Sequence, residues 1–339
     1  MSTTAQTLYG TVGQLGLTRA QARRLLPEWW DPGLEKAPGG VSELAVLLAR
    51  RLSIDAGALL QGRLLPKGAV SSLSFKHRAG LEPEQLAPAS FIASSLAQTV
   101  LAAFSTPYSP LPNDPNVLRA SVVSTAQRIL GFDSLLTACW DYGVPVIPLP
   151  HLPVGVRKMD GAALQVGGRP VIVIAKKKSS RAWLSFILAH EIGHIACGHL
   201  RPGSTIVDVS LQESATYAAE ADADLQEAQA DAFAIELMGG AIVGKEVAAW
   251  PVALSPVEVA VRARNASQRL GVEAGHFILR KAFLTKRWPD AMNALRFLSE
   301  DFDPESVLLG EFRRRLDLDS LSDDMQGMVA QVTGWDGTR

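Results

Sequence analysis

At positions 190 to 194 the sequence reads His190-Glu191-Ile192-Gly193-His194, within an apolar run of helical periodicity. In a helix the two histidines lie one turn apart, about 5.4 Å along the axis, on the same face. Two imidazoles in this arrangement can bind one Zn²⁺ ion at about 2.0–2.1 Å. Glu191 lies beside them, where it can act as general base toward an attacking water without competing as a ligand. The segment therefore predicts a zinc site with a catalytic carboxylate.

The helix expected over residues 181–198 is apolar on nearly every side, with Trp183, Leu188 and Ile195 among its residues. A helix that is hydrophobic all round is buried. Burying two histidines and a glutamate costs free energy unless a partner compensates. A metal ion is the simplest compensation, although the same spacing also arises by chance in chains of this length.

A catalytic zinc site needs three protein ligands and one open position. His199 is a poor third ligand, because it projects about 140° from His194 if the helix continues and Gly198 is expected to end the helix. The extended motif with a third histidine also fails, since Leu200 occupies that position. We therefore expect the third ligand to come from another helix.

Four acidic residues share one face of a second helix, which is predicted over residues 220–238: Glu220, Asp224, Glu227 and Asp231. They are either a solvated acidic stripe or, in part, a buried pair. Small and apolar residues flank Glu227 and Asp231, which favours burial of these two. One of them would then bind the metal, and the other would accept a hydrogen bond from a ligand imidazole.

Two segments, RAWLSFILAHEIGH at residues 181–194 and EAQADAFA at residues 227–234, resemble the motifs of the ImmA/IrrE family of metallopeptidases. The resemblance extends over residues 120–240 and implies a gluzincin-like site. It assigns the third zinc ligand to Glu227, so that Asp231, where the family often has asparagine, is the residue expected to accept a hydrogen bond from a ligand imidazole. Known relatives cleave a repressor or another transcription regulator, so the resemblance implies a regulatory protein as substrate, such as a transcription repressor.

The pattern of elements predicts an α+β fold, mostly helical, with a small β-sheet that follows a small all-helical domain. The resemblance implies that the sheet belongs to a zincin-like catalytic domain. Strands are expected at residues 144–149, 162–166 and 171–175, with Gly167-Gly168 as a hairpin turn, after one helix at 117–136. The predicted division is a helical unit at 1–62, a helical segment with a proline-rich linker at 63–118, the metallopeptidase domain at 119–244 and a helical region at 245–339, whose role the sequence does not indicate.

Residues 1–62 loosely resemble the helix-turn-helix domains of phage-type repressors, which members of the family often carry. Thr18 is a suitable N-cap for a helix, but Ala37-Pro38-Gly39-Gly40 interrupts the stretch where a recognition helix would lie. DNA binding through this unit is one expectation, and a small helical packing module is the other.

Composition restricts the remaining function classes. The formal net charge is −1, so the chain as a whole gives no reason to expect binding to nucleic acid or to a membrane surface. The two cysteines, Cys139 and Cys197, are too few for a disulfide framework and are typical of a reducing compartment. No run of about 18 apolar residues predicts a membrane helix, and no secretory signal is evident. We expect a cytoplasmic protein.

The expected activity is a zinc-dependent endopeptidase in which zinc and Glu191 activate the water. Tyr217 and His199 are both candidates for the oxyanion donor, and the sequence does not choose between them. The strand at 171–175, if it forms an edge, is expected to pair with an extended substrate, so that Val173→Pro would abolish cleavage. The alternative is a DNA-binding or partner-binding transcription regulator that uses the zincin domain as a sensor, although such a protein has no need of Glu191.

Overall fold

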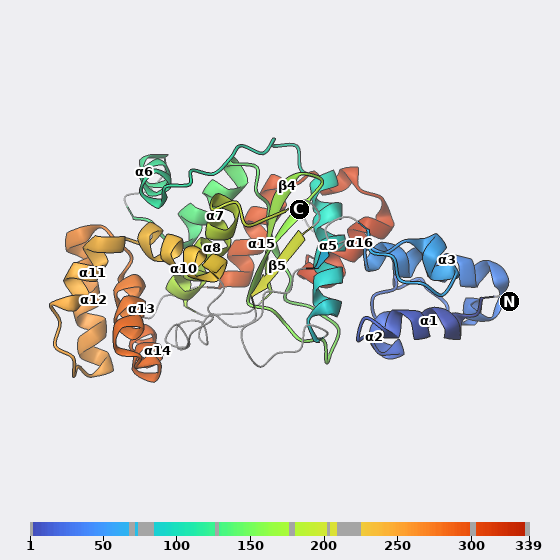
Figure 1. Ribbon diagram of the computed structural model, residues 1–339, viewed down its shortest axis with the longest axis horizontal. Coiled ribbons are helices and arrows are strands. Elements are labelled where there is room, and N and C mark those ends of the chain that lie inside the picture. The colour runs from blue at the N-terminus through green and yellow to red at the C-terminus, as the bar shows by residue number, and fades with distance from the viewer. Residues whose placement is uncertain are drawn as a thin grey trace.

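A mixed five-stranded sheet with strand order β1-β5-β3-β4-β2 lies at the centre of the molecule (Figure 1). The computed structural model describes residues 3–67, 72–73, 85–125, 129–175, 180–201, 204–208, 225–298 and 303–335. The strands are β1 (Ser72–Leu73), β2 (Val146–Pro148), β3 (Gly161–Val166), β4 (Arg169–Ile174) and β5 (Ser204–Asp208). β3 pairs antiparallel with β4 and β5, whereas β2 pairs parallel with β4 and β1 pairs parallel with β5.

The hairpin between β3 and β4 turns at Gly167 and Gly168, as predicted. Their φ angles are 55° and 81°, and two consecutive positive φ values are what a tight two-residue hairpin requires. However, β4 lies in the interior of the sheet, with β3 on one side and β2 on the other. The prediction that this strand is an edge open to substrate is therefore wrong. Because Val173 pairs with both Ala162 and Ile147, Val173→Pro would break the sheet rather than test substrate binding.

Helices cover both faces of the sheet. Three consecutive residues of β3, Ala162, Ala163 and Leu164, are completely buried, although successive side chains point to opposite faces. Helix α8 (Arg181–Ala196) packs against β3 and β4, and α5 (Ala87–Ala102) contacts β3. The two helices lie on opposite sides of the sheet in Figure 1. Burial on both faces explains why these strands are continuous apolar runs without polar alternation.

Most of the remaining described chain is helical, which confirms the predicted α+β class. The helices at the N-terminal end are α1 (Ala5–Gly13), α2 (Arg19–Arg23), α3 (Pro38–Arg51) and α4 (Ala56–Leu60). The helices after residue 239 are α11 (Gly240–Ala248), α12 (Pro256–Leu270), α13 (Ala274–Thr285), α14 (Trp288–Arg296), α15 (Pro304–Arg315) and α16 (Asp323–Thr333). The molecule is elongated, with α1–α3 at one end and α11–α14 at the other (Figure 1). Within the described residues, no helix is both long enough and apolar enough to cross a membrane.

The predicted helix at 117–136 is two helices, α6 (Pro115–Thr125) and α7 (Phe132–Asp141). Leu130 leaves the helical path to form a parallel bridge with Val272, and Gly131 caps α7 in an extended conformation. Local periodicity could not reveal this break, because Val272, the residue with which Leu130 pairs, lies more than a hundred residues further along the chain. The proline-rich stretch 107–112 forms neither helix nor strand, as expected.

The N-terminal helices are held together by a carboxylate that engages two arginines. Arg19 and Arg23 form ion pairs with Glu35 at 2.6 and 2.8 Å, and the Tyr9 hydroxyl donates to the same carboxylate at 2.8 Å. Burial acts to raise the pKa of Glu35, but these three partners hold it below its usual value.

The stretch 37–40, which was expected to interrupt a recognition helix, instead begins α3: Ala37 is the N-cap and Pro38 lies in the first turn, where proline is tolerated. The short 3-10 helix η1 (Pro32–Lys36) precedes it. DNA binding by residues 1–62 stays a prediction.

Candidate metal centre

The metal-binding motif lies on α8, which begins and ends at local signals in the sequence. The Ser180 hydroxyl caps the helix by accepting from the Trp183 backbone, and Gly198, at φ 73°, reverses the chain after Ala196. His190, Glu191 and His194 are completely buried. The expected buried helix with a glycine stop is therefore what the chain forms.

A second helix, α10 (Leu225–Leu237), packs along α8 in the most extensive contact between any two described elements. Gly193 makes this approach possible, because a Cβ at that position would lie 3.0 Å from both the Cα and the carbonyl oxygen of Ala230. The glycine between the two histidines thus sets how closely α10 approaches them. Glu227, on the first turn of α10, is thereby brought to the histidine side chains.

Three ligand atoms converge between the two helices. The Nε2 atoms of His190 and His194 lie 3.0 Å apart, and each is 3.4 Å from one carboxylate oxygen of Glu227. These three residues are all buried, and one ligand atom from each lies within 4.8 Å of the others. Glu227, rather than Asp231, occupies the position of the third ligand.

Hydrogen bonds at the Nδ1 atoms of His190 and His194 fix the orientation of the two rings. His190 Nδ1 lies 2.9 Å from Asp231 Oδ1, so the ring donates to that carboxylate. His194 Nδ1 lies 3.0 Å from His199 Nδ1, and His199 Nε2 lies 2.9 Å from Gln229 Oε1. The consistent neutral arrangement places a proton on Nδ1 of both ligand histidines and on Nε2 of His199. Both Nε2 atoms of the ligand histidines then present lone pairs toward Glu227.

The electrostatics of this cluster fit a cation. Burial acts to raise the pKa of Glu227, but when the rings of His190 and His194 are protonated, their hydrogen bonds and positive charge outweigh burial and lower this pKa well below its usual value. When both Nε2 atoms are unprotonated, a metal ion bound to them would supply that positive charge. Two imidazole lone pairs and a buried carboxylate that face one another repel unless a positive charge lies between them. The donor set of two nitrogens and one oxygen suits a divalent metal ion with a free coordination position. The buried cluster of His190, His194 and Glu227 is therefore compatible with a bound metal ion.

The predicted general base lies next to this cluster. The first residue of β3, Gly161, lies so close to Glu191 that a Cβ at this position would collide with the carboxylate oxygen of Glu191. A glycine at this position gives the carboxylate room beside the histidines. The backbone of the sheet and the metal-binding helix together define where Glu191 lies.

Of the two residues predicted as oxyanion donors, the structure describes only His199. Tyr217 lies outside the described residues, as do Glu220 and Asp224. His199 is only 7% exposed and has both ring nitrogens engaged, by His194 and by Gln229. It therefore orients a metal ligand instead of pointing at substrate. The sequence signal for this role was Gly198, which folds the following histidine back onto the helix.

Because Gly193 sets the distance between the helices, Gly193→Ala is expected to weaken metal binding by roughly tenfold to a hundredfold, the usual effect of displacing groups that orient a metal ligand. A competitive titration against a chromophoric chelator measures this. The control is Gly327→Ala in α16, where an added Cβ meets nothing within 4 Å. Equal affinities in the two variants would contradict the role assigned to Gly193.

Comparison with known proteins gives one family match. Residues 139–238 match the model of the peptidase M78 family, described as the IrrE N-terminal-like domain. The matched segment contains β2 to β5 together with α8 and α10, and hence every residue of the cluster. Helices α1–α4 and α11–α16 lie outside it. No curated protein is similar enough in sequence to count as a relative.

Proposed function

We propose, on the premise that residues 139–238 belong to the ImmA/IrrE family of metallopeptidases, that the protein is a zinc-dependent endopeptidase that cleaves a regulatory protein, most simply a transcription repressor. The observation that carries this proposal is the convergence of His190, His194 and Glu227 beside the buried Glu191. Zinc is the proposed metal because two imidazoles and one carboxylate are a ligand set of catalytic zinc sites.

Zinc held by these three side chains would supply Lewis-acid polarisation of the scissile carbonyl and make a water more acidic. Glu191 accepts the proton of the attacking water and then delivers it to the nitrogen of the leaving amine. Asp231 and His199 hold the two ligand imidazoles in the tautomer that leaves Nε2 unprotonated. Each ionisable group of the cluster thus has a distinct role in peptide hydrolysis.

The alternative function is a transcription regulator that uses the metal domain as a sensor. Two observations favour the enzyme. A sensor needs the three ligands but not the additional buried carboxylate of Glu191, for which Gly161 leaves room. In addition, the two N-terminal arginines at the start of the expected DNA-binding unit are paired with Glu35.

The substrate is best sought by comparing the proteomes of cells that produce the wild-type protein with those that produce Glu191→Gln. We expect one regulatory protein to accumulate intact with the variant and to appear as a fragment with a new N-terminus with the wild type. The purified, zinc-loaded wild-type protein should then make the same cut. If the two proteomes are identical and the purified protein cleaves none of their proteins, the proposed activity is wrong.

A further inference from the structure

A recess lies beyond the metal centre, where α8 and α10 meet α11 and α13. The empty space in and above it, with the space open to solvent counted in, is about 340 Å³. Most of its wall is apolar and consists of Phe186, Ile235, Met238, Val243, Leu279 and Phe283. Two nitrogen-bearing side chains of α13, His276 and Arg280, complete the wall. An apolar recess with a few polar groups at one side is the usual form of a small-molecule site.

His276 is buried in this wall without satisfying its polar atoms. It is 4% exposed, and among the described residues neither of its ring nitrogens has a hydrogen-bond partner. Glu273 Oε2 is 3.6 Å from Nε2, which is too far for a hydrogen bond. Burial lowers the pKa of His276 to about 3, so the ring is neutral and offers one N–H donor. A buried donor without an acceptor costs free energy that a ligand atom would recover.

Arg280 follows His276 by one helical turn and presents a charge to the same recess. Within the described chain it forms no ion pair, and its buried Nε has no hydrogen-bond partner. A guanidinium binds a carboxylate through two parallel hydrogen bonds, which makes it the preferred partner of that group. The unfilled hydrogen-bonding capacity of both residues therefore points to an anionic head group.

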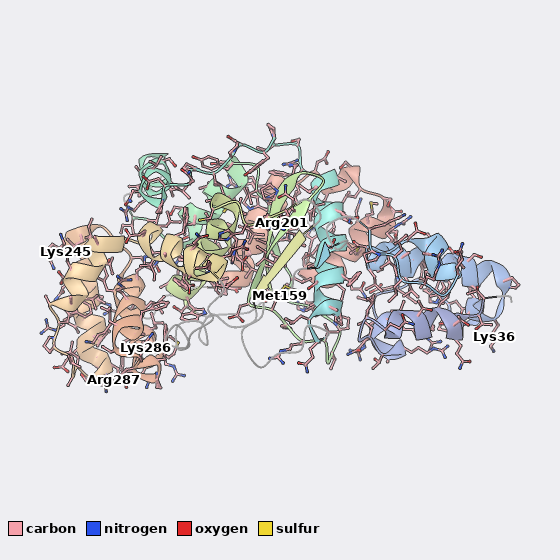
Figure 2. All side chains as sticks on the ribbon, viewed as in Figure 1. Lys36, Met159, Arg201, Lys245, Lys286 and Arg287 are labelled. Carbon is pink, nitrogen blue, oxygen red and sulfur yellow. The ribbon has the colours of Figure 1, made fainter. Side chains whose placement is uncertain are left out.

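The surroundings of the recess carry a positive charge. Residues 240–298 contain nine lysines and arginines against four aspartates and glutamates, although the whole chain has a net charge of −1. Lys245, Lys286 and Arg287 of this segment lie on the lobe formed by α11–α14 (Figure 2). Such a local excess raises the concentration of anions near the surface. The lobe thus favours a negatively charged ligand before any direct contact is made.

We propose that this recess binds a small apolar carboxylic acid, whose carboxylate contacts Arg280 and His276 and whose hydrocarbon part lies against Val243 and the contacting rings of Phe186 and Phe283. The site is separate from the metal ligands. Phe186 lies one turn before His190 on α8, and Ile235 lies one turn after Asp231 on α10. A bound acid would therefore lie against the same two helices that hold the metal.

The test uses ω-phenylalkanoates with acid chains of two to six carbons, together with the primary amide of each, titrated calorimetrically into the full chain. At least one acid is expected to bind with a Kd of about 1 mM or tighter, and its amide at least about tenfold more weakly, since the amide lacks the charge that Arg280 binds. Binding of no acid, or equal binding of acid and amide, would overturn the proposal.

Two variants locate the site. Arg280→Met is expected to raise the Kd of the acid at least about tenfold. Lys245→Met, which removes an exposed charge from the neighbouring α11, is expected to leave this Kd unchanged. Val243→Phe keeps the charge but fills the recess, and it is expected to abolish binding in a protein whose circular dichroism spectrum is unaltered. Equal affinities for Arg280→Met and Lys245→Met, or full binding to Val243→Phe, would place the acid elsewhere. No peptide is cleaved in these titrations, so their outcome is independent of the proposed peptidase activity.

Discussion

Replacement of Glu191 by glutamine is expected to abolish peptide hydrolysis while the metal stays bound. Glutamine has nearly the shape of glutamate, so it fits the space that Gly161 leaves, but it cannot accept the proton of the attacking water. Loss of a general base typically lowers the rate by about 10² to 10⁴-fold. The rate constant kcat/KM for the cleaved substrate and the metal content of the same preparation measure the two effects separately.

The matched control is Glu236→Gln, which makes the same chemical change on α10 in a residue outside the metal cluster. Its kcat/KM is expected to equal that of the wild type. If Glu191→Gln retains metal and also retains full biological activity, catalysis is not what the protein contributes, and the sensor alternative becomes the better explanation. Loss of metal from Glu191→Gln would instead show that this carboxylate belongs to the ligand set.

The parts of the site that could be predicted are those that depend on contacts along one helix. The spacing of His190 and His194 and the apolar residues around them decide that both imidazoles lie on one buried face. Of the four acidic residues on one face of the second predicted helix, the flanking apolar residues favour burial of two, Glu227 and Asp231. The structure distributes the pair as one ligand position and one hydrogen-bond acceptor of a ligand ring. Periodicity carries this information because each helix is a local structure.

The parts that could not be predicted depend on contacts between distant segments. Strand order is one example. The apolar run of β4 indicates that the strand is buried, but it does not indicate that β2 pairs with the edge at which substrate was expected to bind. The chain of hydrogen bonds from His194 through His199 to Gln229 is another, because it needs α10 to lie against the end of α8. The same holds for the two glycines, 161 and 193, whose missing side chains matter only because another segment passes close by.

Glu227→Ala is expected to remove the metal and, with it, the stabilisation that the metal gives to the folded protein. The carboxylate is the only one of the three converging ligands that comes from α10, so without it the ion no longer connects the two helices. Loss of a side chain that binds the metal directly should weaken metal binding by more than the roughly hundredfold loss that follows removal of a residue hydrogen-bonded to a ligand. An ion that binds only the folded state stabilises it by about 4 kcal/mol at a thousand times its Kd.

Thermal unfolding with and without a chelator therefore separates the ligand role of Glu227 from a role in packing alone. For the wild type, zinc should raise the Tm and the chelator should return it to the metal-free value. For Glu227→Ala, the two curves should coincide, whereas Glu236→Ala, on the same helix, should keep the full zinc-dependent shift. A purely structural glutamate would lower the Tm of the metal-free protein and leave the shift intact. If Glu227→Ala retains the shift, the ion is held by a different set of residues and Glu227 is not its third ligand.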